Sequence, residues 1–304
     1  MIRLLLLFAA LLAAVPATAD QYGNHLVALP DGRRLNLNCT GHGKITVLLE
    51  AGYQAWNFTW SGLQPRLEDH YRVCSYDRAG LGFSDPGPSP RDGPAIAADL
   101  DQLITAARLK PPFVLVGHSA GGLSMRLLAD RRVADVIGMV LVDSSVEGQF
   151  AGHEDMLRAV AAGNYACAAA AEAGKLYSPA LPNCADPAMS FMSPPMAARQ
   201  TKIGRTSGYW RTMGSEYESI GTTTVDALRR GRQDYGDLPI VVLTAGTNPA
   251  WIRLHAALAA RSTRGFQHLF PNNGHLLHIE RSDAVASAVD EVVAAGVEPH
   301  RRAR

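Results

Sequence analysis

Short apolar runs separated by polar turns dominate the first half of the chain. The first two, residues 25–29 and 34–39, flank the turn sequence Pro30-Asp31-Gly32 and are predicted to form a β-hairpin. Four later runs are almost continuously apolar, which is typical of parallel strands buried on both faces; they cover residues 45–50, 71–76, 113–117 and 136–142. Helix-like stretches at 94–109 and 120–131 separate the last three of these runs. The order therefore predicts a doubly wound α/β sheet with right-handed crossovers.

This alternation of strands and helices stops after Asp143. The about 90 residues that follow are rich in Ala, Met and Pro and contain no comparable strand, and we interpret residues 146–235 as a mainly helical insertion. The pattern then resumes with a strand at 238–244, a helix at 249–260, a strand at 265–270 and a closing helix at 282–295. We therefore expect one domain made of residues 20–145 and 236–298, interrupted by the insertion and followed by a basic tail at 299–304.

Residues 1–19 have the pattern of a secretory signal peptide. Arg3 precedes an apolar run from 4 to 15, and Ala17-Thr18-Ala19 is the small-x-small sequence after which a signal peptidase cuts. The run is shorter than the roughly 20 apolar residues that a membrane-spanning helix needs, which disfavours a membrane anchor. The mature chain is expected to begin at Asp20 and to be secreted or periplasmic, without a stable membrane anchor.

Charge and cysteine content narrow the function classes. The 29 Lys and Arg balance 28 Asp and Glu, and no basic block precedes the short tail. Nucleic acid is therefore not an expected partner, because phosphate binding needs clustered cations. An even set of cysteines in an exported chain predicts disulfides among Cys39, Cys74, Cys167 and Cys184, for which three pairings exist. Their spacing matches no zinc pattern, and the oligomeric state cannot be read from the sequence.

Residues 117–121, Gly-His-Ser-Ala-Gly, match the G-x-S-x-G nucleophile elbow. The match gains weight from its position after a predicted strand and before a predicted helix, and without them it would be weak. The alternative interpretation is an ordinary glycine-rich turn between strand and helix. Glycines are needed there because a tight strand-to-helix turn brings neighbouring chain close to the serine backbone. Ser119 is therefore the candidate nucleophile, lifted out of the sheet toward solvent.

Four segments, in order, resemble the successive signatures of α/β-hydrolases. They are Leu49-Glu50-Ala51-Gly52, the run Tyr-Asp-Arg-Ala-Gly-Leu-Gly-Phe-Ser at 76–84, residues 116–122 around Ser119, and Gly274-His275 followed by Glu280. The resemblance extends over nearly the whole mature chain and implies an eight-stranded, mostly parallel sheet flanked by helices, with a helical cap inserted after the sixth strand. The family's sheet order places the second strand beside the fourth, and Cys167 and Cys184 both lie in the cap. The resemblance thus predicts the pairs Cys39–Cys74 and Cys167–Cys184.

A serine hydroxyl needs a base to take its proton and a carboxylate to orient that base. His275 follows Asn272-Asn273-Gly274 in the loop after the last predicted strand, where the family carries its catalytic histidine. His278 is the nearest rival, but it falls at the start of the following helical segment. We interpret His275 as the base and His278 as a residue that packs near it.

The candidate acid departs from the commonest family pattern. The loop after the seventh predicted strand, residues 244–249, contains no carboxylate. Some family members carry the acid after the sixth strand instead, which points to Asp143, with Glu147 as second candidate. A strand-end aspartate also often caps the next turn. If neither residue serves, a Ser-His pair or a carboxylate from the cap remains.

An oxyanion hole needs two backbone N–H donors fixed in advance. The resemblance assigns one to Ala120, the residue after the nucleophile, and the other to the loop Gly52-Tyr53, with the Tyr53 N–H as donor. In this chain Ala51-Gly52 replaces the His-Gly pair of many relatives. Asp77 and Arg78 follow the fourth strand, and we interpret them as residues that tie down that turn, not as catalytic groups.

Aromatic residues after the oxyanion loop are candidates for the substrate pocket. Trp56 and Trp60, with Phe58 between them, either line an apolar pocket or belong to the core. A group in the insertion has the same two interpretations: Met189, Phe191, Met192 and Met196. His118 is a third candidate for substrate binding, although a side chain beside an elbow serine is expected to point away and to act structurally.

These residues predict hydrolysis of a carboxylic ester, or a related acyl bond, of a small apolar substrate through an acyl-enzyme, with no cofactor or metal. Amide or peptide cleavage, carbon–carbon hydrolysis and perhydrolase activity are alternatives on the same triad, because specificity lies in the cap. An aspartate at the elbow would indicate epoxide or haloalkane chemistry, and a cysteine would indicate dienelactone-type hydrolysis. Serine at this position disfavours both. A non-catalytic ligand-binding protein on a hydrolase scaffold is the alternative of another class.

Overall fold

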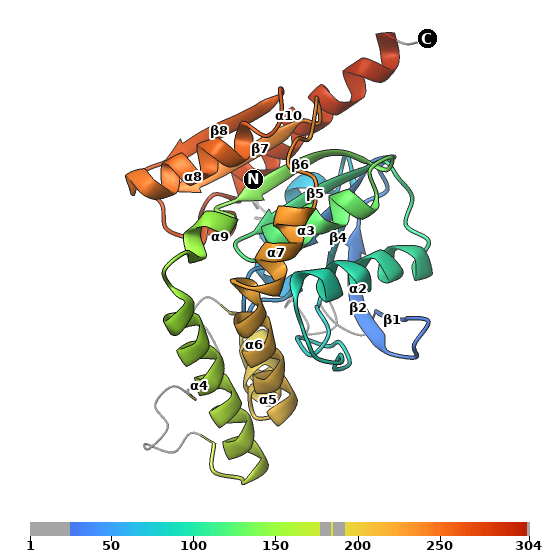
Figure 1. Ribbon diagram of the computed structural model, residues 1–304. Helices are drawn as coiled ribbons and strands as arrows, with labels where there is room; N and C mark the ends of the chain where they lie inside the picture. Colours follow the sequence, from blue (N-terminus) through green and yellow to red (C-terminus); the bar gives the residue numbers. More distant parts are fainter. Residues whose placement is uncertain (1–24, 177–183, 185–191, 303–304) are drawn as a thin grey trace, which may run out of the picture.

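The computed structural model of the protein describes residues 25–176, 184 and 192–302. At its centre is an eight-stranded sheet with strand order β1-β2-β4-β3-β5-β6-β7-β8 (Figure 1). The strands are β1 (Leu26–Ala28), β2 (Arg34–Thr40), β3 (Thr46–Glu50), β4 (Arg72–Tyr76), β5 (Phe113–His118), β6 (Val136–Val142), β7 (Ile240–Ala245) and β8 (Gly265–Phe270). The β1–β2 and β2–β4 pairs are antiparallel, and all other pairs are parallel. The prediction of an eight-stranded, mostly parallel sheet is confirmed.

Helices cover both faces of this sheet (Figure 1). One face carries α2 (Gly93–Ala106), α3 (Gly121–Arg131) and α8 (Pro249–Ala259), and the other carries α1 (Gln64–Leu67) and α10 (Ser282–Arg302). Successive strand residues enter opposite clusters: Leu48 and Leu115 pack on the α2 face, whereas Val47 and Val114 pack on the α10 face. All four are buried, which explains why the central strands show continuous apolar runs.

The closing helix α10 is longer than predicted. It continues to Arg302 instead of ending near Ala295. A Cβ atom at Gly296 would lie 2.5 Å from the main-chain oxygen of Ile137 at the start of β6. Gly296 thus permits a close approach of the helix to the sheet and does not end the helix.

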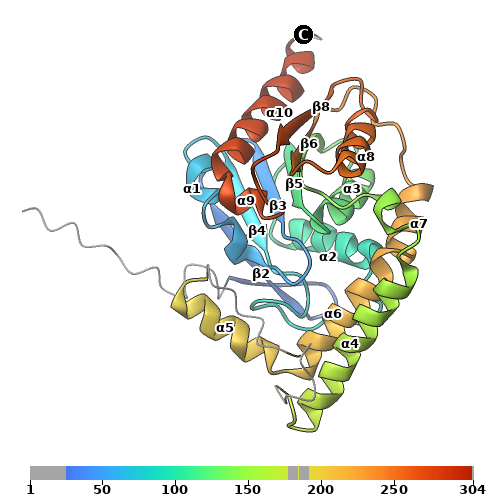
Figure 2. The same cartoon turned by 90° about the vertical axis from the view of Figure 1, so that its left-hand side faces the viewer.

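Between β6 and β7 the chain forms a helical insertion (residues 146–235). It contains the 3-10 helix η3 (Glu147–Phe150) and the helices α4 (Glu154–Glu172), α5 (Pro194–Gly204), α6 (Ser207–Ile220) and α7 (Thr223–Arg230). Helices α4 and α6 run side by side (Figure 2). The insertion packs on the loop after β3 through a buried cluster that joins Trp56 and Phe58 to Met196, Tyr209 and Met213. Of the four apolar residues singled out in this segment, Met189 and Phe191 lie outside the described residues.

Two disulfides connect the described cysteines. Cys39 and Cys74 face each other in the antiparallel register of β2 and β4, and they are bonded. Cys167 of α4 is bonded to Cys184. Both pairs implied by the family resemblance are confirmed, and they are compatible with a secreted protein. The predicted signal peptide lies outside the described residues, and within those residues no helix is long and apolar enough to span a membrane.

Candidate active site

Ser119 occupies the sharp turn between β5 and α3. Its φ of 53° lies in the left-handed region, which costs energy for a residue with a side chain and is typical of a nucleophile elbow. The flanking glycines allow this turn: a Cβ at Gly117 would lie 2.6 Å from the Gly122 Cα, and a Cβ at Gly121 would lie 2.5 Å from the Glu50 carbonyl oxygen. The elbow therefore needs glycine at both positions because neighbouring chain fills the space.

His275 joins Ser119 to Asp143. Its Nε2 lies 2.9 Å from the Ser119 Oγ, and its Nδ1 lies 2.6 Å from the Asp143 Oδ2. His275 comes from the loop after β8 and Asp143 follows β6, so three segments far apart in sequence meet at the carboxyl end of the parallel strands. With Nδ1–H donating to the carboxylate, Nε2 is left to accept the serine proton.

Asp143 is held from two sides. Its Oδ1 accepts hydrogen bonds from the Ala245 main-chain N–H at 3.0 Å and from the Trp251 indole N–H at 2.7 Å. Burial raises the pKa of Asp143, but the hydrogen bonds from His275, Trp251 and Ala245 outweigh it and lower the pKa below its usual value. The carboxylate therefore stays charged. Trp251 lies on α8, and no spacing in the sequence indicated that it would reach Asp143.

Glu147, the second candidate acid, belongs to a different cluster. Its carboxylate accepts two hydrogen bonds from Arg126, at 2.7 and 2.8 Å, and one from Arg261 at 3.0 Å. Burial raises its pKa, but the Arg126 hydrogen bonds outweigh this and hold the pKa at about 2. Asp143, and not Glu147, is the carboxylate that the structure places against His275.

The buried histidines His118 and His278 pack next to His275. The His118 ring centroid is 4.8 Å from that of His275 and 3.9 Å from that of His278. The His118 Nε2 donates to the His275 main-chain oxygen at 2.8 Å, which supports the loop that carries the base. Burial lowers the pKa of His118 to about 3 and that of His278 well below the usual value. Neither ring thus adds a positive charge beside His275 at neutral pH.

The loop after β3 approaches the elbow closely. A Cβ at Gly52 would lie 3.0 Å from the Ser119 Cβ, so this loop borders the nucleophile. Within the described part of the chain, neither the Tyr53 nor the Ala120 main-chain N–H has a protein acceptor. Both residues line the pocket next to Ser119. Both N–H groups are therefore free to donate to a bound ligand, and their assignment to an oxyanion hole stays a prediction.

A pocket of about 300 Å³ opens beside Ser119 and His275. Apolar side chains form much of its wall: Ala55, Phe150, Tyr217, Ile220 and Leu276. Polar groups are contributed by Thr59, Ser145 and Gln149, and His118 and His278 also line it. Phe150, Tyr217 and Ile220 belong to the insertion, and their distance from Ser119 in sequence gave no sign that they would meet it.

Trp56 and Trp60 do not line this pocket, which corrects their prediction as substrate-binding residues. Both are fully buried. The Trp56 indole N–H donates to the Gln200 Oε1 at 2.6 Å, and its ring packs with the insertion. Trp60 packs in the core with α1 and α10. Burial of two large indole rings in these cores stabilises the fold and removes them from the site.

Asp77 and Arg78 have different tasks, although they are adjacent. Asp77 accepts hydrogen bonds from the Asn57 and Phe83 main-chain N–H groups and from the Asn36 side chain, so it ties down the turn after β4 as predicted. Arg78 does not hold that turn with its side chain. Its guanidinium reaches instead to the loop after β3 and to α6, and sequence analysis missed this connection.

Comparison with known proteins places this geometry in a family. A model described as the alpha/beta hydrolase family matches residues 39–288. The uncharacterized protein YqjL of Bacillus subtilis (strain 168) is 25% identical over 259 residues, which are 83% of this chain and 85% of YqjL. A thermophilic esterase from Thermogutta terrifontis has a TM-score of 0.66 at 20% identity, over 89% of this chain and 98% of that one. The epoxide hydrolase CorEH has a TM-score of 0.67 at 18% identity over the same shares. These two structures show a common fold alone, and the family match shows that the chain belongs to the alpha/beta hydrolase family.

Proposed function

We propose that the protein is a serine hydrolase that cleaves carboxylic esters of small, largely apolar acyl compounds. The observation that carries this proposal is the continuous hydrogen-bonded series Ser119–His275–Asp143, with 2.9 and 2.6 Å between the interacting atoms. A nucleophile, a base and an orienting carboxylate in this order are what acyl transfer to serine requires. Tyr53 and Ala120 line the adjoining pocket, and their main-chain N–H groups, which have no protein acceptor among the described residues, support the proposal as candidate oxyanion donors.

The reaction follows from this geometry. The His275 Nε2 takes the proton of Ser119 as Oγ attacks the ester carbonyl, and the N–H groups of Tyr53 and Ala120 bind the oxyanion that forms. The imidazolium, stabilised by Asp143, then gives its proton to the departing alkoxide, and an acyl-serine remains. Water attacks the acyl-serine with His275 again as base, which releases the carboxylic acid and restores Ser119.

Serine at the elbow supports ester cleavage over epoxide opening, although epoxide hydrolases share the fold. A carboxylate that attacks an epoxide forms an ester, which water can cleave to regenerate the enzyme. Attack by the Ser119 hydroxyl would form an ether, which His275 and water have no means to hydrolyse. An acyl substrate, in contrast, gives a serine ester that the same base can remove.

The pocket supports a small and mainly apolar substrate. Its volume of about 300 Å³ lies at the lower end of the range for small-molecule sites. Phe150, Ile220 and Leu276 supply apolar wall close to Ser119. We therefore expect p-nitrophenyl acetate and butyrate to be cleaved faster than the palmitate ester.

The proposal is tested with these p-nitrophenyl esters and with a fluorophosphonate that labels activated serines. The wild type is expected to turn over the short esters and to take up one label on Ser119, located by peptide mass spectrometry. Ser119→Ala should lose both, whereas Ser287→Ala, which removes an exposed hydroxyl on α10, should keep both. Equal ester turnover by the wild type and Ser119→Ala would contradict the proposal. Ligand binding without turnover would favour a non-catalytic protein.

A further inference from the structure

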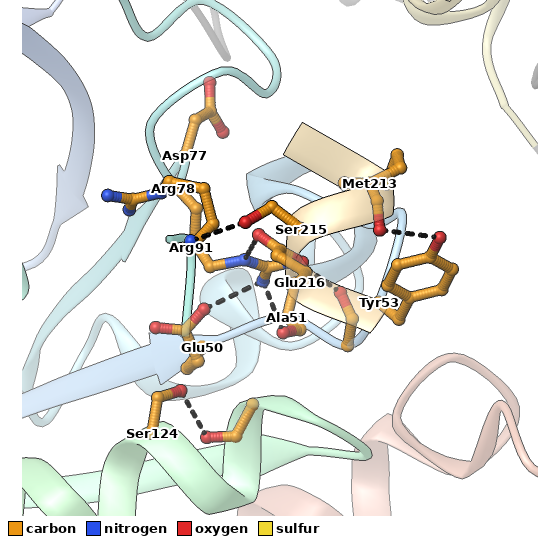
Figure 3. A network of polar contacts seen from close by, with 12 residues as sticks. Glu50, Ala51, Tyr53, Asp77, Arg78, Arg91, Ser124, Met213, Ser215 and Glu216 are labelled. Carbon is orange, nitrogen blue, oxygen red and sulfur yellow. Dashed lines mark hydrogen bonds and ion pairs between the residues drawn. The ribbon is translucent and has the colours of Figure 1, made fainter. Parts of the chain in front are cut away.

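The buried guanidinium of Arg78 donates hydrogen bonds to the main chain of the loop after β3, residues 51–53, here called the oxyanion loop. Its Nη1 donates to the Glu50 Oε1 at 2.9 Å and to the Ala51 carbonyl oxygen at 2.8 Å (Figure 3). Its Nη2 donates to the Gly52 carbonyl oxygen at 2.9 Å and to the Glu216 Oε2 at 3.1 Å, and its Nε donates to the Glu216 Oε1 at 2.9 Å. The side chain is 4% exposed. All five N–H groups of the arginine are thereby used, two of them on the main chain of one loop.

The Gly52 carbonyl oxygen accepts from Arg78 and also, at 3.2 Å, from the Ala55 main-chain N–H, and its direction sets that of the second proposed oxyanion donor. The Gly52 carbonyl and the Tyr53 N–H belong to one peptide unit, which is planar and trans, so that the C=O and N–H bonds point in opposite directions. Fixing the carbonyl oxygen on Arg78 therefore aims the Tyr53 N–H away from Arg78. A cation on the carbonyl also polarises the peptide and strengthens its N–H as a donor.

The insertion holds both this arginine and the donor residue. Glu216 lies on α6 and makes a two-pronged pair with Arg78. The Tyr53 hydroxyl donates to the Met213 carbonyl oxygen, also on α6, at 3.2 Å (Figure 3). It also accepts from the Asn164 side chain of α4 at 3.0 Å. The loop after β3 is thus fixed to α6 at two points, one behind its main chain and one at the side chain of Tyr53.

We propose that Arg78, anchored by Glu216, is a positioning residue for the oxyanion hole, so that the helical insertion takes part in transition-state binding as well as in enclosing the substrate. The inference rests on the proposed function, because it takes the Tyr53 N–H as an oxyanion donor. Lysine cannot replace Arg78, since a single ammonium cannot reach the two loop carbonyls and the Glu216 carboxylate with the same geometry.

The test separates transition-state binding from ground-state binding. Arg78→Lys is compared with Arg126→Lys, which alters another buried arginine that has no contact with the oxyanion loop. Two ketones serve as probes: an aryl trifluoromethyl ketone, which forms a tetrahedral adduct with the serine, and the matching methyl ketone, which binds without one. Glu216→Gln provides a second variant that keeps the side-chain shape, in case Arg78→Lys does not fold.

We expect Arg78→Lys to lower kcat by about 10²-fold with KM changed less than about threefold, which approaches the loss of one oxyanion donor. The affinity for the trifluoromethyl ketone should fall by the same factor as kcat/KM, while the affinity for the methyl ketone stays unchanged. Glu216→Gln should show the same split at about tenfold, because Arg78 keeps its loop bonds but loses a charged anchor. Arg126→Lys should leave the ratio of the two affinities as in the wild type.

Folded Arg78→Lys or Glu216→Gln could show the same ratio of the two ketone affinities as the wild type and differ only by a lower melting temperature. This result would overturn the inference, whereas the proposed function would stand as long as the wild type cleaves esters. Absence of both ester turnover and Ser119 labelling in the wild type would instead overturn the proposed function, and the inference with it.

Discussion

Two largely buried clusters of arginine and glutamate differ in what their arginines hold. The oxyanion-loop cluster is Glu50, Arg78 and Glu216; the α3 cluster is Arg126, Glu147 and Arg261. Arg78 places two of its hydrogen bonds on the main chain of the loop beside Ser119. Arg126 reaches only side chains, Glu147 and the Tyr235 hydroxyl. We expect a buried ion pair to serve the reaction where it fixes backbone next to the nucleophile, and to serve the fold where it holds only side chains.

The charge balance of the clusters differs as well. Burial raises the pKa of Glu50 to about 7 and outweighs the Arg78 guanidinium and the Tyr76 hydroxyl, which lower it; the nearby Glu216 carboxylate adds to the rise. Glu147 has two arginines to itself, and its pKa is held at about 2. The oxyanion-loop cluster thus has one arginine for two carboxylates, of which Glu50 is partly protonated near neutral pH, whereas the α3 cluster has two arginines for one carboxylate that stays charged.

The largest expected effect concerns a buried carboxylate outside both clusters, Asp143, and it gives the scale against which the other losses of activity are compared. Asp143→Asn should lower kcat about 10⁴-fold, because an amide no longer holds His275 in the tautomer that accepts the Ser119 proton. The measurement is ester turnover at saturating substrate. Asp135→Asn, which changes an aspartate paired with Arg132 on the surface, is the control and should stay within twofold of the wild type, a change of about 0.4 kcal/mol. A loss below tenfold for Asp143→Asn would contradict the triad.

The distinction between the two clusters would be wrong if substitutions in the α3 cluster also lowered kcat. Arg126→Met should lower the free energy of unfolding by about 3 kcal/mol, at the low end for a broken buried pair because Arg261 still contacts Glu147. Urea unfolding measures this loss. The kcat of the folded variant should remain near that of the wild type. A fall in kcat as large as that of Arg78→Lys would remove the distinction between the clusters.

A smaller effect is expected on the pH dependence of the unfolding free energy, to which Glu147 of the α3 cluster contributes. The pKa of Glu147 in the folded protein, about 2, lies below its ordinary value of 4.5, so its charged form stabilises the fold above pH 4.5. This contribution is lost as the pH falls from 4.5 toward 2. The difference in unfolding free energy between the wild type and Glu147→Gln should therefore shrink between pH 6 and pH 3. A constant difference would mean that the Arg126–Glu147 pair contributes no such stability.

The smallest effect is expected at the second attachment of the oxyanion loop. Tyr53→Phe removes the hydroxyl that contacts Met213 and Asn164, which should cost about 1 kcal/mol of stability. The kcat should fall less than in Arg78→Lys, because the Gly52 carbonyl stays on the guanidinium. Thermal unfolding and ester turnover measure the two effects, with Tyr71→Phe, whose hydroxyl donates to Asp290 at an exposed site outside the pocket, as control. A larger kcat loss than in Arg78→Lys would make the tyrosine side chain the main support of the loop.

Much of the fold was predictable because its signals are local. The eight strands were expected within a few residues of their positions, since continuous apolar runs and turn residues report the burial of each strand directly. The elbow was predictable for a related reason, because Gly117 and Gly121 are required by close backbone contacts around Ser119. His275 and Asp143, each at the end of a strand, were proposed as partners of Ser119, and the structure brings all three together.

The errors and omissions involve residues whose surroundings come from elsewhere in the chain. Trp56 and Trp60 follow the oxyanion loop, and the insertion and α10 bury them away from the pocket. Arg78 sits in a turn motif that suggested a local task, yet its partners lie on β3, on the following loop and on α6. Trp251 supports Asp143 from a helix that carries no sign of this contact in its own pattern.

The sequence by itself determined the succession of strands and helices along the chain, the tight turn that exposes Ser119, and the residue types able to perform acyl transfer. Periodicity and glycine spacing carry this information because they reflect burial and backbone contact within one element. The tertiary structure alone decided which buried charges share a space, what lines the pocket, and that α6 reaches the oxyanion loop. These depend on the path of the insertion between β6 and β7, since contacts between distant segments arise only when helices and sheet pack together.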